Sequence, residues 1–219
     1  KGPTSHDIVD AVRRITGERR VGHAGTLDPM AEGILVIGIG RDATKQLANE
    51  VAKEKEYVAT VRLGATSTTD DAEGEIEISD SKIQISDSDI KRILPQFIGR
   101  IEQVPPVYSA VKVRGTPAHR RVRKGENVTL APRIVEIRSI EVLRYEWPLA
   151  RRSLGEGGEL ELRIVCGPGT YIRSLARDVG RALGVGGYLI ALSRTRIGAY
   201  TRDTALTIEQ FQAQWSGDR

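Results

Sequence analysis

The stretch GHAGTLDPMAEGIL, residues 22–35, decides how the rest of the chain is interpreted. Glycines and Pro29 surround Asp28 in a segment without helical or alternating apolar periodicity. Because glycine allows tight turns and the residue before a proline is kept out of helical geometry, we predict a loop over residues 19–33. Such a loop can present a short carboxylate for chemistry, although an aspartate in a turn also commonly accepts backbone N–H bonds. The spacing alone leaves both interpretations open.

Regular elements are predicted on both sides of this loop. Thr4 and Asp7 have capping-box spacing and Gly17 supplies a stop, so we expect a helix between them. Farther along, the pattern predicts strands at 34–40, 57–63, 107–113, 133–145, 159–166 and 188–198, and helices at 43–53, 88–98, 170–183 and from Thr207. The inward face of the helix at 170–183 is expected to be formed by Ile172, Leu175, Val179 and Leu183. Strands and helices mix without a regular βαβ alternation, so the predicted fold class is α+β with a largely antiparallel or mixed sheet. The glycine-rich segment 151–159 is expected to join two strands of a hairpin.

Composition limits the class of protein. With 39% hydrophobic and 28% charged residues among 219, the chain has the balance of a folded, soluble protein. No apolar run approaches the roughly 20 residues that cross a bilayer, and no signal peptide is visible. Cys166 is the only cysteine, which excludes an internal disulfide and a cysteine cluster for zinc. We therefore expect a cytoplasmic protein.

The distribution of positive charge is more informative than its sum. A net charge of +4 supports nucleic-acid binding only weakly. Residues 112–124, which we call the basic strip, contain no acid. Their cations are Lys112, Arg114, Arg120, Arg121, Arg123 and Lys124. Because Gly115 and Pro117 interrupt the strip, it is predicted to be a mobile excursion from the sheet.

Other catalytic motifs are weak or absent. GIGRDA, residues 38–43, matches the dinucleotide fingerprint G-x-G-x-x-A, but no acid follows at the spacing of about 20 residues that a ribose contact needs. The three histidines are far apart, and the sequence has no zinc, calcium, nucleophile-elbow or phosphate-loop motif. Asp28 and Glu32 have no defined separation as a glycosidase pair. A dehydrogenase is therefore an outside alternative.

Residues 22–35 resemble the signature of the TruB family of pseudouridine synthases, G-H-x-G-x-L-D-P-x-A-x-G. Four further segments resemble family motifs in the same order, so the resemblance covers essentially the whole chain. They are YVATVRLGATSTTDDAEG (57–74), PPVYSAVKVRG (105–115), GPGTYIRSLARDVGRAL (167–183) and LSRTRIG (192–198). The resemblance implies the pseudouridine synthase fold, an α+β arrangement with a curved mixed sheet, flanking helices and a central active-site cleft.

The resemblance also implies a reaction, the isomerisation of a uridine in RNA, which needs no cofactor and no metal. Asp28 is the implied catalytic carboxylate, and Arg173 the cation that keeps it ionised. A tyrosine with a pKa near 10 is a poor base, so Tyr57 is expected to stack on the uracil rather than to move a proton. The other implied uracil-binding positions are Tyr171, Leu192 and Asp71, although Asp71 is equally compatible with an exposed loop acid.

The implied substrate is the T-loop uridine of tRNA at the position called 55, which must be flipped out of its loop. His23 is the family's candidate for entering the RNA loop. The basic strip resembles a thumb, over about 112–125, whose cations contact phosphates of the T arm. An aromatic commonly follows the thumb glycine in the family, whereas this chain has His119 and then Arg120 there. We expect a monomer that needs no protein partner and binds no membrane.

The expected organisation is a catalytic domain over residues 1–205 and a short C-terminal helix and tail over 206–219, with no PUA-type RNA-binding domain. The lysine-proline element that normally precedes the first helix is missing. Two alternatives within RNA biology are a guide-RNA-dependent pseudouridine synthase subunit and a non-catalytic RNA-binding or RNA-folding module. Asp28, Tyr57 and Arg173 occur together, which disfavours the non-catalytic alternative.

Overall fold

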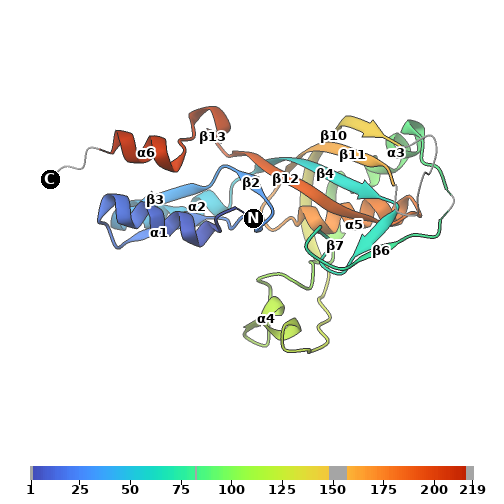
Figure 1. The fold of residues 1–219 in the computed structure, drawn as a ribbon, viewed down its shortest axis with the longest axis horizontal. Helices are drawn as coiled ribbons and strands as arrows, with labels where there is room; N and C mark the ends of the chain where they lie inside the picture. The colour runs from blue at the N-terminus through green and yellow to red at the C-terminus, as the bar shows by residue number, and fades with distance from the viewer. Residues whose placement is uncertain (1, 82, 148–156, 216–219) are drawn as a thin grey trace. The chain divides into compact units, whose positions relative to one another are not determined.

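The computed structural model describes residues 2–81, 83–147 and 157–215 (Figure 1). Within these ranges the chain forms two compact units. Unit 1 contains residues up to Tyr57 and from Leu192 onward, and unit 2 contains Val58–Ala191. Two strands, β4 (Lys55–Leu63) and β12 (Gly187–Ile197), pass from one unit into the other. The predicted domain boundary between residues 205 and 206 stays a prediction.

Unit 1 begins with α1 (Ser5–Thr16), and the predicted capping signals are confirmed. The Thr4 side chain accepts a hydrogen bond from the Asp7 backbone N–H, and the Asp7 carboxylate accepts one from Thr4 in return. Gly17 ends the helix at a φ of 70°. The buried face of α1, formed by Val9 and Val12, packs with residues of β1 and of α6 (Ile208–Gln214).

The loop predicted over residues 19–33 is only partly correct. β1 (Val21–Ala24) pairs antiparallel with β3 (Val36–Ile39), and β2 (Glu32–Gly33) pairs parallel with β12. Gly22, one of the glycines that indicated a loop, allows a helix to approach β1 closely, because a Cβ there would lie 3.0 Å from the Leu47 side chain. Leu47 belongs to α2 (Gly40–Val51), the helix that follows β3. The irregular part is therefore residues 25–31.

The sheet of unit 2 has the strand order β12-β4-β11-β10-β7. β10 (Arg133–Glu146) and β11 (Glu159–Cys166) form the predicted antiparallel hairpin, although most of the connecting segment lies outside the described residues. The sequence did not predict β7 (Gly99–Gln103), which pairs antiparallel with β10. In unit 1, β13 (Tyr200–Thr201) also pairs antiparallel with β12. With β2 parallel to β12, the sheet is mixed, and the α+β prediction is confirmed.

Two helices of unit 2 follow the predicted positions, whereas α4 (Ala118–Val122) was not predicted. α3 (Asp87–Ile93) continues into a 3-10 turn at Leu94–Phe97, and α5 covers Ile172–Ala182. The predicted inward face of α5 is buried at Ile172, Leu175, Val179 and Leu183. The polar region 64–89 contributes only a small hairpin of β5 (Ala65–Ser67) and β6 (Ile76–Ile78).

The strand predicted at 107–113 is wrong for most of its length. Only Lys112–Val113 is extended, as β8, and it pairs with β9 (Thr116–Pro117). The carbonyls of Ser109 and Val111 instead accept N–H bonds from the next helix, α4 (Ala118–Val122). Figure 1 shows α4 on an excursion away from the sheet of unit 2, as the basic strip predicted. A small core formed by Val111, Ala118, Val128 and Leu130 holds this excursion together.

None of the helices in the described ranges is long and apolar enough to cross a membrane.

Candidate active site

Asp28 lies in the irregular part of unit 1 and is half-buried. Its carbonyl accepts a 2.8 Å bond from the Ala31 N–H, which closes a turn through Pro29. One residue earlier, the Leu27 N–H donates to the hydroxyl of Ser5 at 3.0 Å. Ser5 is the first residue of α1 and is only 6% exposed. The loop is therefore anchored to a capped helix immediately before the predicted catalytic residue.

Arg194 contacts both ends of the same loop. Its side chain comes from β12, and its Nε and Nη2 atoms donate to the carbonyls of Ile34 and Gly25 at 2.9 and 3.0 Å. The side chain is 1% exposed. A buried cation is thus bound to main-chain oxygens on either side of Asp28.

Two further predicted site residues belong to unit 1. Tyr57 on β4 is 8% exposed and Leu192 on β12 is 6% exposed. Their burial fits a pocket wall as well as an ordinary core, so burial alone does not separate the two interpretations.

His23 lies on β1, opposite Ile37 of β3, and not in a turn. Its Nδ1 atom is buried without a hydrogen-bond partner among the described residues. Burial lowers the pKa of His23 from its ordinary value of 6.5, and the positive charge of Arg194 lowers it further. The imidazole is therefore kept neutral near pH 7, which suits stacking on a base better than ion pairing with a phosphate.

In unit 2, Arg173 is fixed by contacts to its own guanidinium. It lies in the first turn of α5 and is 5% exposed. Its Nη1 atom is 3.3 Å from Oδ2 of Asp71, and the guanidinium also donates to the carbonyls of Thr69 and Tyr108 at 3.2 and 3.1 Å. Arg173 is therefore a buried residue and not a surface arginine.

Asp71 is 4% exposed, so the alternative of an exposed loop acid is also wrong. Its Oδ1 atom accepts bonds from the Thr69 hydroxyl at 2.5 Å and from the Glu73 N–H at 3.0 Å. Oδ2 faces Arg173. Both oxygens therefore have partners, as a buried carboxylate requires.

Tyr171 is the residue immediately before α5 and is half-buried. Gln103, at the end of β7, holds its backbone from both sides. The Gln103 amide N donates to the Tyr171 carbonyl at 3.1 Å, and its Oε1 accepts from the Tyr171 N–H at 2.8 Å. Gln103 is 2% exposed. One buried amide thus sets the start of the helix that carries Arg173.

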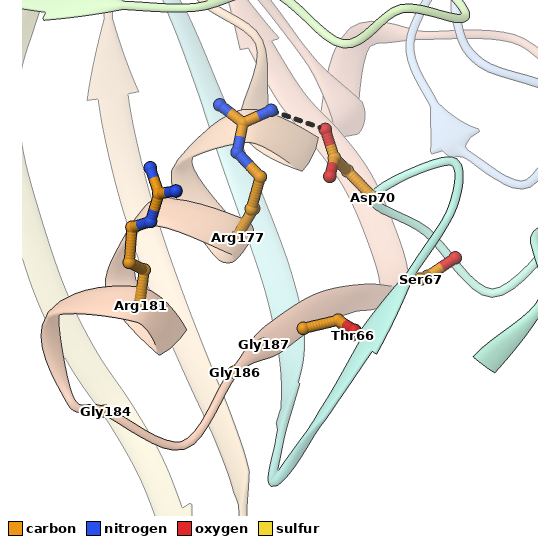
Figure 2. Close-up of a pocket in the computed structure, with 8 residues that line it drawn as sticks. All are labelled: Thr66, Ser67, Asp70, Arg177, Arg181, Gly184, Gly186 and Gly187. Carbon is orange, nitrogen blue, oxygen red and sulfur yellow. Dashed lines mark hydrogen bonds and ion pairs between the residues drawn. The ribbon is translucent and has the colours of Figure 1, made fainter. Parts of the chain in front are cut away.

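Unit 2 also contains a cavity of about 410 Å³, shown in Figure 2. In this view Arg177 points toward Asp70 across an ion pair of 2.7 Å, and Arg181 lies one turn farther along α5. Burial raises the pKa of Asp70, although Arg177 and Arg173 act in the opposite direction. None of the predicted site residues is among those that line it. The lining residues are Thr66, Ser67, Asp70, Arg177, Arg181, Gly184, Gly186 and Gly187.

Most cations of the basic strip point into solvent. Lys112, Arg114, Arg120, Arg123 and Lys124 are exposed. Arg121 is half-buried and ion-paired with Glu126 at 2.5 Å. His119 is held through its Nδ1 atom to the Ser109 carbonyl at 2.9 Å. The strip therefore offers exposed cations on α4 and on the segments beside it, in an excursion with its own small core.

Comparison with known proteins identifies the family. A family model described as "TruB family pseudouridylate synthase (N terminal domain)" matches residues 13–172. A second, described as "tRNA pseudouridylate synthase B C-terminal domain", matches residues 173–218. The chain belongs to the TruB family. The family predicted from the sequence motifs is therefore confirmed, and it is a family of isomerases.

Several TruB-family proteins are similar over nearly the whole chain. The tRNA pseudouridine synthase B of Arthrobacter sp. (strain FB24) is 48% identical over 210 residues, which are 96% of this chain and 67% of that protein. The protein of the same name from Thermobifida fusca (strain YX) is 48% identical over 217 residues, 98% of this chain and 72% of that protein.

The fold of this TruB-family chain is also similar to that of chains in solved complexes that contain Cbf5. A Cbf5-Nop10-Gar1 complex contains a chain with a TM-score of 0.70 and 29% identity, and the archaeal box H/ACA sRNP Nop10-Cbf5 complex one with 0.66 and 26%. Each match covers 97% of this chain and about half of the solved chain, 51% and 50% respectively. The fold prediction is confirmed.

Sequence reasoning missed three buried polar residues of this TruB-family chain: Arg194, Gln103 and Asp70. Arg194 lies in a predicted strand, and a charged residue at an inward strand position would have been the signal. Gln103 belongs to the strand that was not predicted, so its amide had no assigned neighbour.

Proposed function

We propose that this chain is the catalytic part of an enzyme that isomerises uridine to pseudouridine in tRNA, with Asp28 as its catalytic carboxylate. The observation that carries the proposal is the loop of residues 25–34. It contains most of the family motif, and buried contacts hold it in place next to Asp28 at Leu27 and at both ends. An aspartate placed only to cap a turn would not need such support.

The chemistry balances without an external reagent. The bond between uracil N1 and the sugar carbon breaks, the base turns, and a carbon–carbon bond forms from C5 to the same sugar carbon. The hydrogen at C5 leaves as a proton, and N1 gains one. Asp28 assists either by adding to the base or by trapping the sugar carbon, and both routes use an ionised carboxylate. No electrons are exchanged, so the proposed reaction requires no cofactor or metal.

Five residues stay our candidates for groups around the uracil: Tyr57, Tyr171, Arg173, Leu192 and Asp71. Arg173 provides the cation that favours an ionised carboxylate, and Asp71 orients Arg173. Tyr57 provides an aromatic face for the base. Each of these roles is the one that the family resemblance implies for the motif in which the residue lies.

The substrate proposed is the uridine at position 55 in the T loop, flipped out of its stack. His23, kept neutral, would enter the RNA loop. The exposed cations of the basic strip would bind phosphates of the T arm, which gives affinity that falls with salt. This grip favours an enzyme that binds its RNA directly. We propose that it acts as a monomer in the cytoplasm without a protein partner. The alternative is a guide-dependent subunit, because the solved relatives are named in ribonucleoprotein complexes.

Tritium release from unmodified tRNA labelled at C5 of uridine tests the proposal. The wild-type chain should release tritium, and Asp28→Asn should lower turnover by about 10⁴-fold or more while tRNA binding stays nearly unchanged. Glu32→Gln, an exposed acid in the same loop, is the matched control and should keep activity. Substantial turnover by Asp28→Asn would contradict the assignment of the carboxylate. A wild-type chain that binds tRNA without releasing tritium would favour the RNA-binding alternative.

A further inference from the structure

Arg194 is the largest fully buried side chain of the described residues. A guanidinium stays charged at any pH that a protein tolerates, so its burial is costly unless its N–H groups find acceptors. Its polar contacts go to the main chain of one segment, residues 25–34. Hydrogen bonds to carbonyls of that segment therefore offset the cost of burying this charge, and they form only when the segment is ordered.

The guanidinium bridges two points far apart along the loop. Nε and Nη2 lie on the same edge of the planar group, and they donate to Ile34 and Gly25 at 2.9 and 3.0 Å. Asp28 lies three residues after Gly25 and six before Ile34. Both ends of the loop are thus tied to one rigid group.

The backbone of Arg194 holds the same loop from the other side. The Ile34 N–H donates to the Arg194 carbonyl at 2.9 Å, and Gly33 is the register partner of Arg194 in the parallel β2–β12 pair. A Cβ on Gly33 would lie 2.2 Å from the Arg194 carbonyl oxygen, and the φ of Gly33 is 102°. Main chain and side chain of one residue therefore clamp the end of the loop.

We propose that Arg194 is the positioning residue for the Asp28 carboxylate, closing the loop of residues 25–34 so that the acid stands in one place. This inference rests on the proposed function, in which Asp28 reacts. Arg194 acts through the loop and need not touch the substrate.

Lysine cannot replace the arginine in this role. Its ammonium carries the charge but is a compact group on a flexible stem, whereas the guanidinium presents two parallel donors. Arg194→Lys therefore keeps the charge and most of the volume while losing the simultaneous contact to Gly25 and Ile34. Arg196→Lys is the matched control, because Arg196 lies on the same strand and pairs through its charge with Glu54 at 2.7 Å.

Single-turnover tritium release and tRNA binding test the proposal together. For Arg194→Lys in the whole 219-residue chain we expect the chemical step to slow by about 100-fold, the effect of misplacing a reacting group by about 1 Å. The dissociation constant for tRNA should change by no more than about threefold, and Arg196→Lys should behave as wild type on both measures. An unchanged chemical step, or an equal loss of tRNA binding in a folded variant, would overturn the proposal.

Hydrogen exchange separates this proposal from the proposed function, since it needs no RNA. In Arg194→Lys, amides of residues 25–34 should exchange at least about 10-fold faster than in wild type, while those of α2 stay unchanged. If the wild type releases no tritium, the proposed function fails, yet the exchange still decides whether Arg194 holds the loop. Should Arg194→Lys fail to fold, Gly25→Ala disturbs the acceptor end of the same contact, because the φ of Gly25 is 79° and an alanine is strained there. Wild-type exchange and turnover in a folded Gly25→Ala would overturn the clamp.

Discussion

The loop around Asp28 and the start of α5 hold their predicted functional residues in different ways. In the loop, the holding contacts go to the main chain, from the Arg194 guanidinium and the Ser5 hydroxyl. At α5, they go to the functional side chain itself, because Asp71 and two carbonyls contact the Arg173 guanidinium. Ser5 and Arg194 therefore shape the backbone that carries Asp28, whereas Asp71 contacts the side chain of Arg173 directly.

Because of this difference, a variant in the loop should change the position of Asp28, whereas a variant beside α5 should change the charge around Arg173. A change at Arg194 that keeps its charge, such as Arg194→Lys, is expected to move the point where the Asp28 carboxylate stands. Changing Asp71 alters the electrostatic environment of Arg173 directly, since an opposite charge within about 4 Å is lost. Variants in the two regions should therefore differ in stability as well as in activity.

The largest stability effect is expected at the buried pair of unit 2. Asp71→Asn removes a carboxylate beside Arg173, with both side chains about 5% exposed, and should lower the free energy of unfolding by about 3 kcal/mol. Denaturant unfolding measures the loss. Asp178→Asn is the matched control, because its ion pair with Arg177 is about one quarter exposed and is worth at most about 1 kcal/mol. Equal losses in the two variants would show that the buried pair with Arg173 stabilises the fold no more than a partly exposed ion pair.

A smaller effect is expected where unit 2 also uses a main-chain contact. Gln103→Leu leaves the N–H and carbonyl of Tyr171 without their amide partner and should cost about 2 kcal/mol of unfolding free energy. Gln96→Leu, at an exposed position of the 3-10 turn, should change stability by no more than about 0.5 kcal/mol. A loss in Gln103→Leu as small as in the control would show that the amide does not set the start of α5.

The smallest expected effect is that of the Arg194 charge on the pKa of His23. His23 should titrate with a midpoint below 6.5, followed through its imidazole resonances by NMR, and Arg194→Met should raise that midpoint. Since the folded pKa is lowered, the stability contributed by neutral His23 is present above pH 6.5 and is lost as the pH falls toward the folded pKa. A midpoint at or above 6.5 in the wild type would contradict the burial of this ring next to a cation.

The sequence predicted elements whose signals are local. The α1 caps at Thr4 and Gly17 and the inward face of α5 depend on residues within a few positions of each other, and the structure has them as predicted. β1 was missed because Gly22 and the glycines after it indicate a loop until β3 is known to pair with β1. The strand expected at 107–113 was wrong because its carbonyls bond to α4 instead of a neighbouring strand.

The candidate site shows the same limit. Asp28 and Arg173 were found because they stand in dense motifs of contiguous residues. Arg194 and Gln103 were missed because their roles are bonds to residues 169, 160 and 68 positions away, and no local pattern records such a bond. The motifs predict the residues that react or bind, whereas the residues that position them are identified only from the structure.

The distance in sequence between the loop and Arg194 has a consequence for synthesis. The Thr4 cap closes over three residues and can form as soon as α1 emerges from a ribosome. The clamp on Ile34 waits for a residue 160 positions later, which at about 5–20 residues per second is a delay of about 10–30 s. Nearly the whole chain is therefore made before the loop can close. A nascent chain would carry the Asp28 motif throughout that interval without a formed catalytic loop.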